Sequence, residues 1–185
     1  MIVLGLAGNL DLETYGSPRR TCGAALEILQ RRGIQIVAHS RWFESAPVPI
    51  SDQPWFINGV VGIETTQPPH DLVKTVLDVE TELGRRRSIP NAARTIDIDV
   101  LAYGDQIISA CDQADTKSDV EIPHPRMNSR AFVMLPLADI APDWVHPKSG
   151  VHMRDLINAL PADQVCRPFS DGDGLSGTEL QPEPA

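Results

Sequence analysis

The sequence contains few cysteines, and they are not arranged as a binding motif. Its 185 residues include 3 cysteines, Cys22, Cys111 and Cys166, which lie far apart and form no Cys-x-x-Cys pair. This spacing excludes the common zinc motifs and dithiol redox motifs. An odd number of scattered cysteines favours reduced thiols, so a cytoplasmic location is expected.

Basic residues are also scarce. The chain has 16 of them, 13 arginines and 3 lysines, against 25 acidic residues, and its net charge is −9. A nucleic-acid-binding surface needs basic side chains to displace counterions, and an anionic membrane attracts the same charges. Neither nucleic acid nor membrane is therefore expected as a partner. The positive charge for any polyanionic ligand must be gathered in one part of the chain.

No apolar run approaches the roughly 20 residues of a membrane-spanning helix. The apolar N-terminus, residues 1–8, has no preceding basic residues and is followed by Asp11 and Glu13. It predicts a first strand and not a signal peptide. A hydrophobic content of 42% with 22% charged residues is typical of a globular domain. Small-molecule substrates are the expected partners, and a monomer is compatible with the sequence.

Hydrophobic periodicity predicts the order strand, helix, strand, strand, helix, strand in the first hundred residues. Ser17 is expected to cap the first helix, which Pro18 begins and Gly33 ends. This order predicts an α+β fold with a ferredoxin-like βαββαβ core, in which helices cover one face of an antiparallel sheet. An extra strand near 106–110 and C-terminal helices near 131–140 and 153–160 are expected to follow. We expect a single domain over 1–169 and a disordered tail over 170–185, which is rich in Gly, Pro and acidic residues. The expected core strands are 2–7, 34–44, 55–65 and 95–102.

Glycine-rich phosphate-binding loops are absent, so phosphate would have to be bound by metal ions and side chains. Asp97 and Asp99 suit this role, because period-two alternation places both on one face of a predicted strand. Two carboxylates about 7 Å apart repel by roughly 2 kcal/mol at an effective dielectric of about 20. Divalent cations bound between them would remove this repulsion and could hold substrate phosphates. The alternative is an ordinary strand with a solvated acidic face.

A cluster of positive charge lies just before this strand. Arg85, Arg86, Arg87 and Arg94 place four of the 16 basic residues within ten positions. Guanidinium groups bind phosphate bidentately and keep their charge, which is what a polyphosphate requires opposite a metal site. The alternative is a solvated basic loop in an arginine-rich chain.

Three further residues could bind a ligand. Prolines on both sides of His124 restrict its backbone and present the imidazole in one direction, although a stiff turn explains the same pattern. Phe56 and Asn58 share one face of a predicted strand, where an aromatic ring and an amide suit a flat heterocycle. Core packing with a buried amide is the alternative. No Ser/His/Asp or Cys/His arrangement indicates a covalent nucleophile.

Taken in order, these segments resemble the 6-hydroxymethyl-7,8-dihydropterin pyrophosphokinase family of folate biosynthesis. The resemblance spans roughly residues 2–160. The motifs that carry it are Gly8-Asn9-Leu10, Ser45-Ala46-Pro47, Gln53-Pro54-x-Phe56-x-Asn58, Glu80, Gly84-Arg85-x-Arg87, Arg94-Thr95-x-Asp97-x-Asp99, Pro123-His124-Pro125 and Arg130-x-Phe132.

The resemblance implies a three-layer αβα single domain around the ferredoxin-like core. It also implies that a pyrophosphoryl group passes from ATP to the hydroxymethyl oxygen of the pterin, with release of AMP and with a pair of Mg²⁺ ions as cofactors. Under this resemblance Asp97 and Asp99 are the metal ligands, and they act in catalysis with Arg85, Arg87 and Arg94. The implied ATP-binding residues are Glu80, Arg87, Arg94, Val100, His124 and Arg130. The implied pterin-binding residues are Ala7, Ser45, Ala46, Pro47, Val48, Phe56, Asn58 and Phe132.

Several positions depart from the commonest pattern of that family, including Ser45-Ala46, where Thr-Pro is usual, and Pro49, where Gly is frequent. These changes leave the acidic pair and the arginines in place. Two other functions remain compatible with the residues. One is a different Mg²⁺-dependent nucleotidyl or phosphoryl transferase that uses an Asp-x-Asp pair, and the other is a catalytically silent pterin- or nucleotide-binding module.

Overall fold

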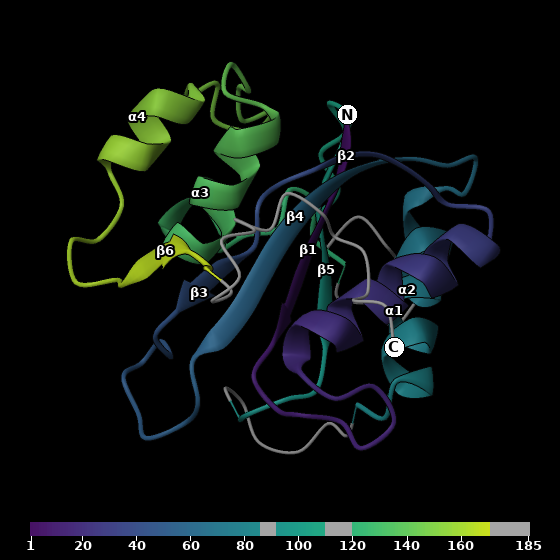
Figure 1. Cartoon of the computed structure of the whole chain (residues 1–185). Helices are drawn as coiled ribbons and strands as arrows, with labels where there is room; N and C mark the ends of the chain where they lie inside the picture. The colour runs from purple at the N-terminus through teal and green to yellow at the C-terminus, as the bar shows by residue number, and fades with distance from the viewer. Residues whose placement is uncertain (86–91, 110–119, 171–185) are drawn as a thin grey trace.

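The computed structural model describes residues 1–85, 92–109 and 120–170, which form a six-stranded sheet with helices on both faces (Figure 1). Every strand pair is antiparallel. The spatial order is β5-β1-β4-β3-β6, and β2 also pairs with β4. The strands are β1 (Ile2–Gly8), β2 (Gln35–His39), β3 (Phe43–Ser45), β4 (Phe56–Glu64), β5 (Asp97–Tyr103) and β6 (Cys166–Pro168).

The two long helices form the split βαβ units that the sequence predicts. Helix α1 (Pro18–Arg31) connects β1 to β2, and β4 lies between those two strands. Helix α2 (Pro69–Glu82) connects β4 to β5 across β1. This is the ferredoxin-like arrangement, and it confirms the expected core.

Three layers result, because α3 (Ala131–Ile140) and α4 (Met153–Asn158) cover the sheet face opposite α1 and α2 (Figure 1). A short 3-10 helix, η2 (Met127–Ser129), precedes α3. Period-two alternation divides the apolar side chains between the faces. On β4, Val61 packs in the cluster beneath α1 and α2, whereas Val60 packs in the cluster beneath α3 and α4. Among the described residues, no helix combines the length and apolar character that crossing a bilayer requires.

The strand expected over 34–44 is broken into β2 and β3 around Ser40. The buried hydroxyl oxygen of Ser40 accepts a hydrogen bond from the Val60 N–H at 3.0 Å and donates to the Arg41 carbonyl at 2.6 Å. A side chain thereby replaces a backbone partner in the ladder, and the pairing of β4 passes from β2 to β3. The sequence pattern shows the apolar residues, but it does not show that a side-chain hydrogen bond replaces a backbone one at Ser40.

Smaller differences concern the additions to the core. The strand expected near 106–110 is reduced, in its described part, to a single bridge between Ile108 and Ile122. Strand β6 was not predicted at all. Ser17 occupies the N-cap of α1, but its side chain makes no capping hydrogen bond. Residues 171–185 lie outside the described part of the chain, so the disordered tail stays a prediction.

Candidate active site

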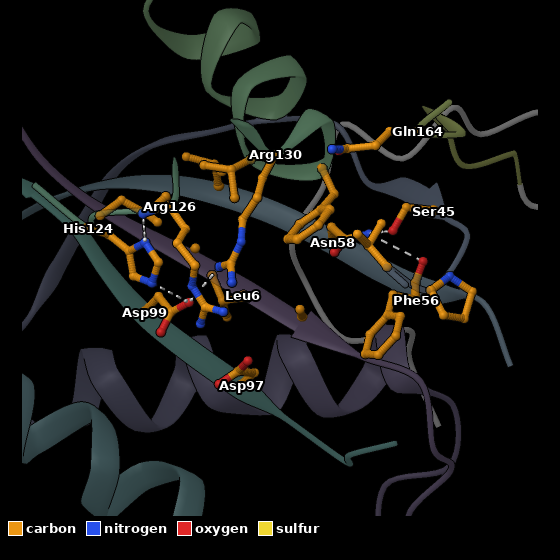
Figure 2. A pocket seen from close by; sticks show the side chains of 18 of the residues that line it. Leu6, Ser45, Phe56, Asn58, Asp97, Asp99, His124, Arg126, Arg130 and Gln164 are labelled. Atoms are coloured by element: carbon orange, nitrogen blue, oxygen red, sulfur yellow. Dashed lines mark hydrogen bonds and ion pairs between the residues drawn. The ribbon is translucent and has the colours of Figure 1, made fainter. Parts of the chain in front are cut away.

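A pocket of about 600 Å³ opens beside α3, on the sheet face that α3 and α4 cover (Figure 2). Its floor consists of β1, β4 and β5, and its walls come from the segment after β3 and the segment that runs from His124 to α3. Segments distant in the sequence therefore meet in one cavity. The sequence-predicted residues that line it are Ala7, Ser45, Ala46, Pro47, Val48, Phe56, Asn58, Arg85, Arg94, Asp97, Asp99, His124, Arg130 and Phe132.

Three predicted site residues are not among the described residues that line the pocket. The side chain of Val100 packs in the apolar cluster on the opposite face of the sheet, because it alternates with Asp97 and Asp99 along β5. Glu80 is buried on α2, behind the pocket lining. Arg87 lies outside the described residues. The structure does not test the role predicted for any of these residues.

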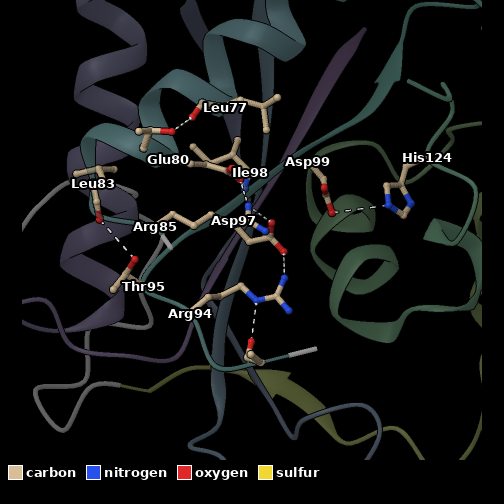
Figure 3. A network of polar contacts seen from close by, with 12 residues as sticks. Leu77, Glu80, Leu83, Arg85, Arg94, Thr95, Asp97, Ile98, Asp99 and His124 are labelled. Atoms are coloured by element: carbon tan, nitrogen blue, oxygen red, sulfur yellow. Dashed lines mark hydrogen bonds and ion pairs between the residues drawn. The ribbon is translucent and has the colours of Figure 1, made fainter. Parts of the chain in front are cut away.

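A network of charges connects α2 to the acidic face of β5 (Figure 3). Arg85 follows α2 and forms ion pairs with Glu80 and with Asp97, whose Oδ1 lies 2.5 Å from the Arg85 guanidinium. Arg94 pairs with the other oxygen of Asp97. Glu80 also accepts a hydrogen bond from the Ile98 N–H at 2.6 Å, which attaches the helix to the strand. Asp97 is thus held between two guanidinium groups.

Burial dominates the titration of Glu80. Desolvation raises the pKa of this carboxyl to about 7, and the Ile98 N–H and the Arg85 guanidinium oppose the rise. The charge of Asp97 also acts to raise the pKa of Glu80. Desolvation acts to lower the pKa of Arg85, but the Asp97 and Glu80 carboxylates together raise it, so its guanidinium keeps its positive charge. The network therefore presents a fixed cation at the edge of the pocket.

Asp99 has a different environment from Asp97. Its side chain keeps 38% exposure toward the pocket, and His124 Nε2 and the Arg130 guanidinium each lie 3.8 Å from Oδ2. Desolvation first and the charge of Asp97 second raise the pKa of Asp99, while His124 and Arg130 act to lower it. A multivalent cation bound nearby would stabilise the charged form of this carboxylate.

The backbone determines the tautomer of His124. Its Nδ1 accepts a hydrogen bond from the Arg126 N–H at 3.2 Å, so the neutral imidazole carries its proton on Nε2, which faces Asp99 (Figure 2). Burial lowers the pKa of His124, and the charge of Asp99 opposes this. The Nε2–H group of His124 is thus a donor that faces Asp99, while the effect of the flanking prolines on the ring stays a prediction.

The other end of the pocket is aromatic and amide-lined. Asn58 is buried, and its Nδ2 donates to Ser45 Oγ at 3.0 Å and to the Phe56 carbonyl at 3.3 Å. These bonds orient the amide within the pocket. Phe56 on β4 adds one ring from the floor, and Phe132 on α3 adds another from the wall. The Arg94 guanidinium lies 5.9 Å from the Phe56 ring, which connects the aromatic end to the charged end.

Asn9 has a positioning role that the sequence motif did not reveal. Its Oδ1 accepts from the Arg94 N–H at 2.8 Å, and its Nδ2 donates to the Pro54 carbonyl at 3.0 Å. It thereby joins the end of β1 to the segments before β4 and before β5. The neighbouring Gly8 permits this approach, because a Cβ there would lie 2.5 Å from the Thr95 carbonyl oxygen. The available signal in the sequence was an Asn directly after a predicted strand.

Other lining residues were also missed. Arg126 adds a cation beside His124, and Ser129, Pro161 and Gln164 complete the wall near α3. Arg126 could have been included from its place in the Pro-flanked histidine motif. Gln164 lies in a polar turn with no periodic pattern, and nothing local in the sequence distinguishes it.

Comparison with known proteins identifies the family. Residues 3–142 match the family model described as 7,8-dihydro-6-hydroxymethylpterin-pyrophosphokinase (HPPK). A Synechocystis protein named 2-amino-4-hydroxy-6-hydroxymethyldihydropteridine pyrophosphokinase is 35% identical over 98% of this chain and 86% of its own length. A Pseudomonas aeruginosa protein of the same name is 35% identical over 90% of this chain and 95% of its own.

Solved structures agree on the fold. A crystal structure of wild-type Plasmodium falciparum HPPK-DHPS superposes with a TM-score of 0.64 at 15% identity. The match covers 85% of this chain and 42% of that longer one. At this identity the likeness concerns the fold alone. The family-model match and the two bacterial relatives place the chain itself: it belongs to the 7,8-dihydro-6-hydroxymethylpterin-pyrophosphokinase family.

Proposed function

We propose that the chain transfers the pyrophosphoryl group of ATP to the hydroxymethyl oxygen of 6-hydroxymethyl-7,8-dihydropterin, releasing AMP, in folate biosynthesis. One observation carries this proposal: a single pocket has a carboxylate–arginine end and an aromatic–amide end. The first end suits a polyphosphate and the second a flat heterocycle with hydrogen-bonding edges. Family membership supports the same reaction.

The residues present fit Mg²⁺ as the cofactor. Asp97 and Asp99 line the same pocket, and carboxylate oxygens are the ligands that Mg²⁺ prefers. Among the described residues no group of three or more acidic, His or Cys side chains could hold a metal alone. This suits Mg²⁺, which commonly binds through one or two carboxylates together with substrate phosphates. Bound there, the ions would neutralise triphosphate charge and polarise the phosphoryl oxygens.

The protein's own groups would bind and orient the substrates. Arg85, Arg94 and Arg130 surround the acidic pair and are placed to pair with phosphate oxygens, while His124 Nε2–H can donate to them. The hydroxymethyl oxygen would then form a bond to the β-phosphorus as the bond from that phosphorus to the α-phosphate bridging oxygen breaks. AMP leaves with that oxygen, and the hydroxyl proton passes to solvent.

Positioning and electrostatics supply the catalysis in this proposal. Among the described lining residues the carboxylates are Asp97 and Asp99, which lie near arginines and are the proposed metal ligands. Neither is therefore assigned the role of a dedicated base. Phe56, Phe132 and Asn58 would hold the pterin against the charged end and restrict its approach to one direction.

Product analysis tests the proposal. Purified protein with Mg²⁺, ATP and the reduced pterin is expected to yield AMP and a pyrophosphorylated pterin in equal amounts. Release of inorganic pyrophosphate with a nucleotidylated product would instead indicate a nucleotidyltransferase. Binding of both ligands without AMP would indicate a silent binding module.

We also propose that the protein acts as a monomer in the cytoplasm. The scattered cysteines support the location, since burial raises the pKa of the Cys22 and Cys166 thiols to about 12 and disfavours reactive thiolates. Size-exclusion chromatography with light scattering tests the monomer, and a mass of about 20 kDa is expected for a chain of 20.2 kDa.

A further inference from the structure

Residues 161–169 form a segment that reaches back across the molecule to the pocket. The segment lies beyond residue 142, where the match to the family model ends. Pro161 and Gln164 line the pocket, and β6 follows them. We call residues 161–169 the C-terminal strap.

Gln164 attaches the strap to the start of α3. Its Oε1 accepts a hydrogen bond from the Ala131 N–H at 2.8 Å, and its Nε2 donates to the Ser129 carbonyl at 2.7 Å. Ala131 is the first residue of α3, where N–H groups have no partner within the helix. The amide of Gln164 therefore caps the helix from a distant part of the chain. Arg130 and Phe132 lie on either side of the residue it holds.

The next residue of the strap holds the opposite wall. The Val165 carbonyl accepts a hydrogen bond from the Ala46 N–H at 3.1 Å, and Ser45 on β3 pairs with Cys166 on β6. Outside the pocket, the Arg167 guanidinium bonds Glu44 at 2.5 Å, which anchors the far end of the pairing. Two consecutive residues, Gln164 and Val165, thus connect α3 to the loop that begins at Ala46.

We propose that Gln164 is a positioning residue for the pterin, and that it sets the separation between the two walls of the aromatic end of the pocket. Figure 2 shows Gln164 on the same side of the pocket as Ser45 and Asn58, away from Asp97 and Asp99. The inference rests on the proposed function, because it concerns the ligand of that end. Its consequence is differential: disturbing Gln164 weakens binding of the pterin more than binding of the ATP phosphates. Of the proposed phosphate-binding residues in the described part of the chain, Arg130 alone adjoins Ala131.

Three substitutions test this role. Gln164→Ala removes the side chain, Gln164→Met keeps its length without hydrogen bonds, and Gln164→Glu keeps the acceptor for Ala131 but loses the donor to Ser129. The matched control is Gln30→Ala, which alters an exposed glutamine on α1, across the sheet from the pocket. Circular dichroism and a melting curve establish that each variant is folded.

Dissociation constants are measured by calorimetry for 6-hydroxymethylpterin, in the presence of Mg²⁺ and a non-transferring ATP analogue, and separately for the analogue alone. We expect Gln164→Ala and Gln164→Met to weaken pterin binding about tenfold, which is about 1.4 kcal/mol, because the two walls no longer keep their separation. The loss of affinity for the analogue should be smaller, because it involves Arg130 alone among the phosphate-binding residues described. Gln164→Glu should weaken pterin binding as well, because its carboxylate faces the Ser129 carbonyl. Gln30→Ala should match the unmodified protein.

Wild-type affinity for the pterin in Gln164→Met would overturn the proposal, because the length of the side chain without its hydrogen bonds would then be enough to keep the two walls in place. An equal loss of pterin and analogue binding would also overturn it, because it would indicate a general structural role. If Gln164→Ala does not fold, the Met and Glu variants decide the question in the same way. Failure of the unmodified protein to bind pterin or to form AMP would instead contradict the proposed function.

Discussion

Asp97 lies between the guanidinium groups of Arg85 and Arg94 and shares a strand face with Asp99. It is therefore the point at which the positive and negative parts of the site meet. Without it, the arginines lose the carboxylate that holds them over the pocket, and a metal ion loses one of its proposed ligands.

Asp97→Ala is expected to lower turnover about a hundredfold or more, because developing phosphoryl charge would lose both metal and arginine positioning. Arg85 keeps its partner Glu80, so the fold should persist. Steady-state formation of AMP measures the effect. The matched control is Asp78→Ala on α2, where an exposed carboxylate pairs only with Lys74 in the described structure, at 3.4 Å. Substantial residual activity in Asp97→Ala would count against the metal role.

Glu80 makes the stability of the protein depend on pH. Burial raises the pKa of its carboxyl from 4.5 to about 7. The folded state therefore binds the proton more tightly than the unfolded state, so the free energy of unfolding falls as pH rises from about 4.5 to about 7. The contribution lost over this range is up to about 3 kcal/mol.

Glu80→Gln should abolish that part of the pH dependence, because glutamine can accept from the Ile98 N–H without titrating. Urea unfolding at about pH 5 and about pH 8 measures the difference in unfolding free energy for each protein. Glu82→Gln, on the exposed side of the same helix, is the control and should retain the wild-type slope. If the unfolding free energy of Glu80→Gln depends on pH as strongly as that of the wild type, another group is responsible for the dependence.

At the scale of elements, Asn9 links β1 to the segments that enter β4 and β5. Asn9→Ala leaves the Arg94 N–H and the Pro54 carbonyl without this partner. We expect the free energy of unfolding to fall by about 1–3 kcal/mol for each of these groups that stays buried. Asn9→Asp keeps the acceptor for Arg94 and loses only the donor, so we expect an intermediate loss of stability. Thermal unfolding and kcat measure both effects, with exposed Asn158→Ala as the control. Equal losses of stability in Asn9→Ala and Asn9→Asp would contradict the view that the bonds to Arg94 and to Pro54 contribute separately.

Local pattern predicted the elements that alternate or repeat regularly. The acidic pair on β5 and the Phe56–Asn58 pair on β4 were placed correctly, because period-two alternation determines which side chains share a face. The same alternation places the Val100 side chain in the core, although the family resemblance assigned Val100 to the ATP site. The packing of this side chain does not test the ATP-binding role that the resemblance implies for Val100, which stays a prediction.

Contacts between distant segments could not be predicted in this way. Asn9 bonds a residue 85 positions away, and Gln164 bonds one 33 positions away. Strand β6 has three residues and ends in proline, so its pairing depends on β3 and not on its own sequence. Ser40 likewise interrupts a strand through a hydroxyl that carries no periodic signal.

At the scale of the whole molecule, the net charge of −9 conceals a local separation of charge. Arg85, Arg94, Arg126 and Arg130 all line one pocket, together with His124. Screening confines such fields to about 8 Å at physiological salt, so a phosphate in the pocket experiences these cations more strongly than the acidic surface. An acidic protein can therefore bind a polyanion.

The sheet separates two apolar clusters, and the one beneath α3 and α4 is the smaller. A layer with fewer buried contacts opens at lower free energy, so its backbone amide hydrogens exchange with solvent sooner. Hydrogen–deuterium exchange should show faster uptake in α3 than in α1. Since Phe132 on α3 and Phe56 on β4 face the same cavity, bound pterin should slow that uptake and leave α1 unchanged. Equal protection of both layers would contradict this view. If α3 is the less protected helix and pterin slows its exchange, the substrate completes the packing of the layer formed by α3 and α4. The enzyme is then most rigid when its substrate is bound.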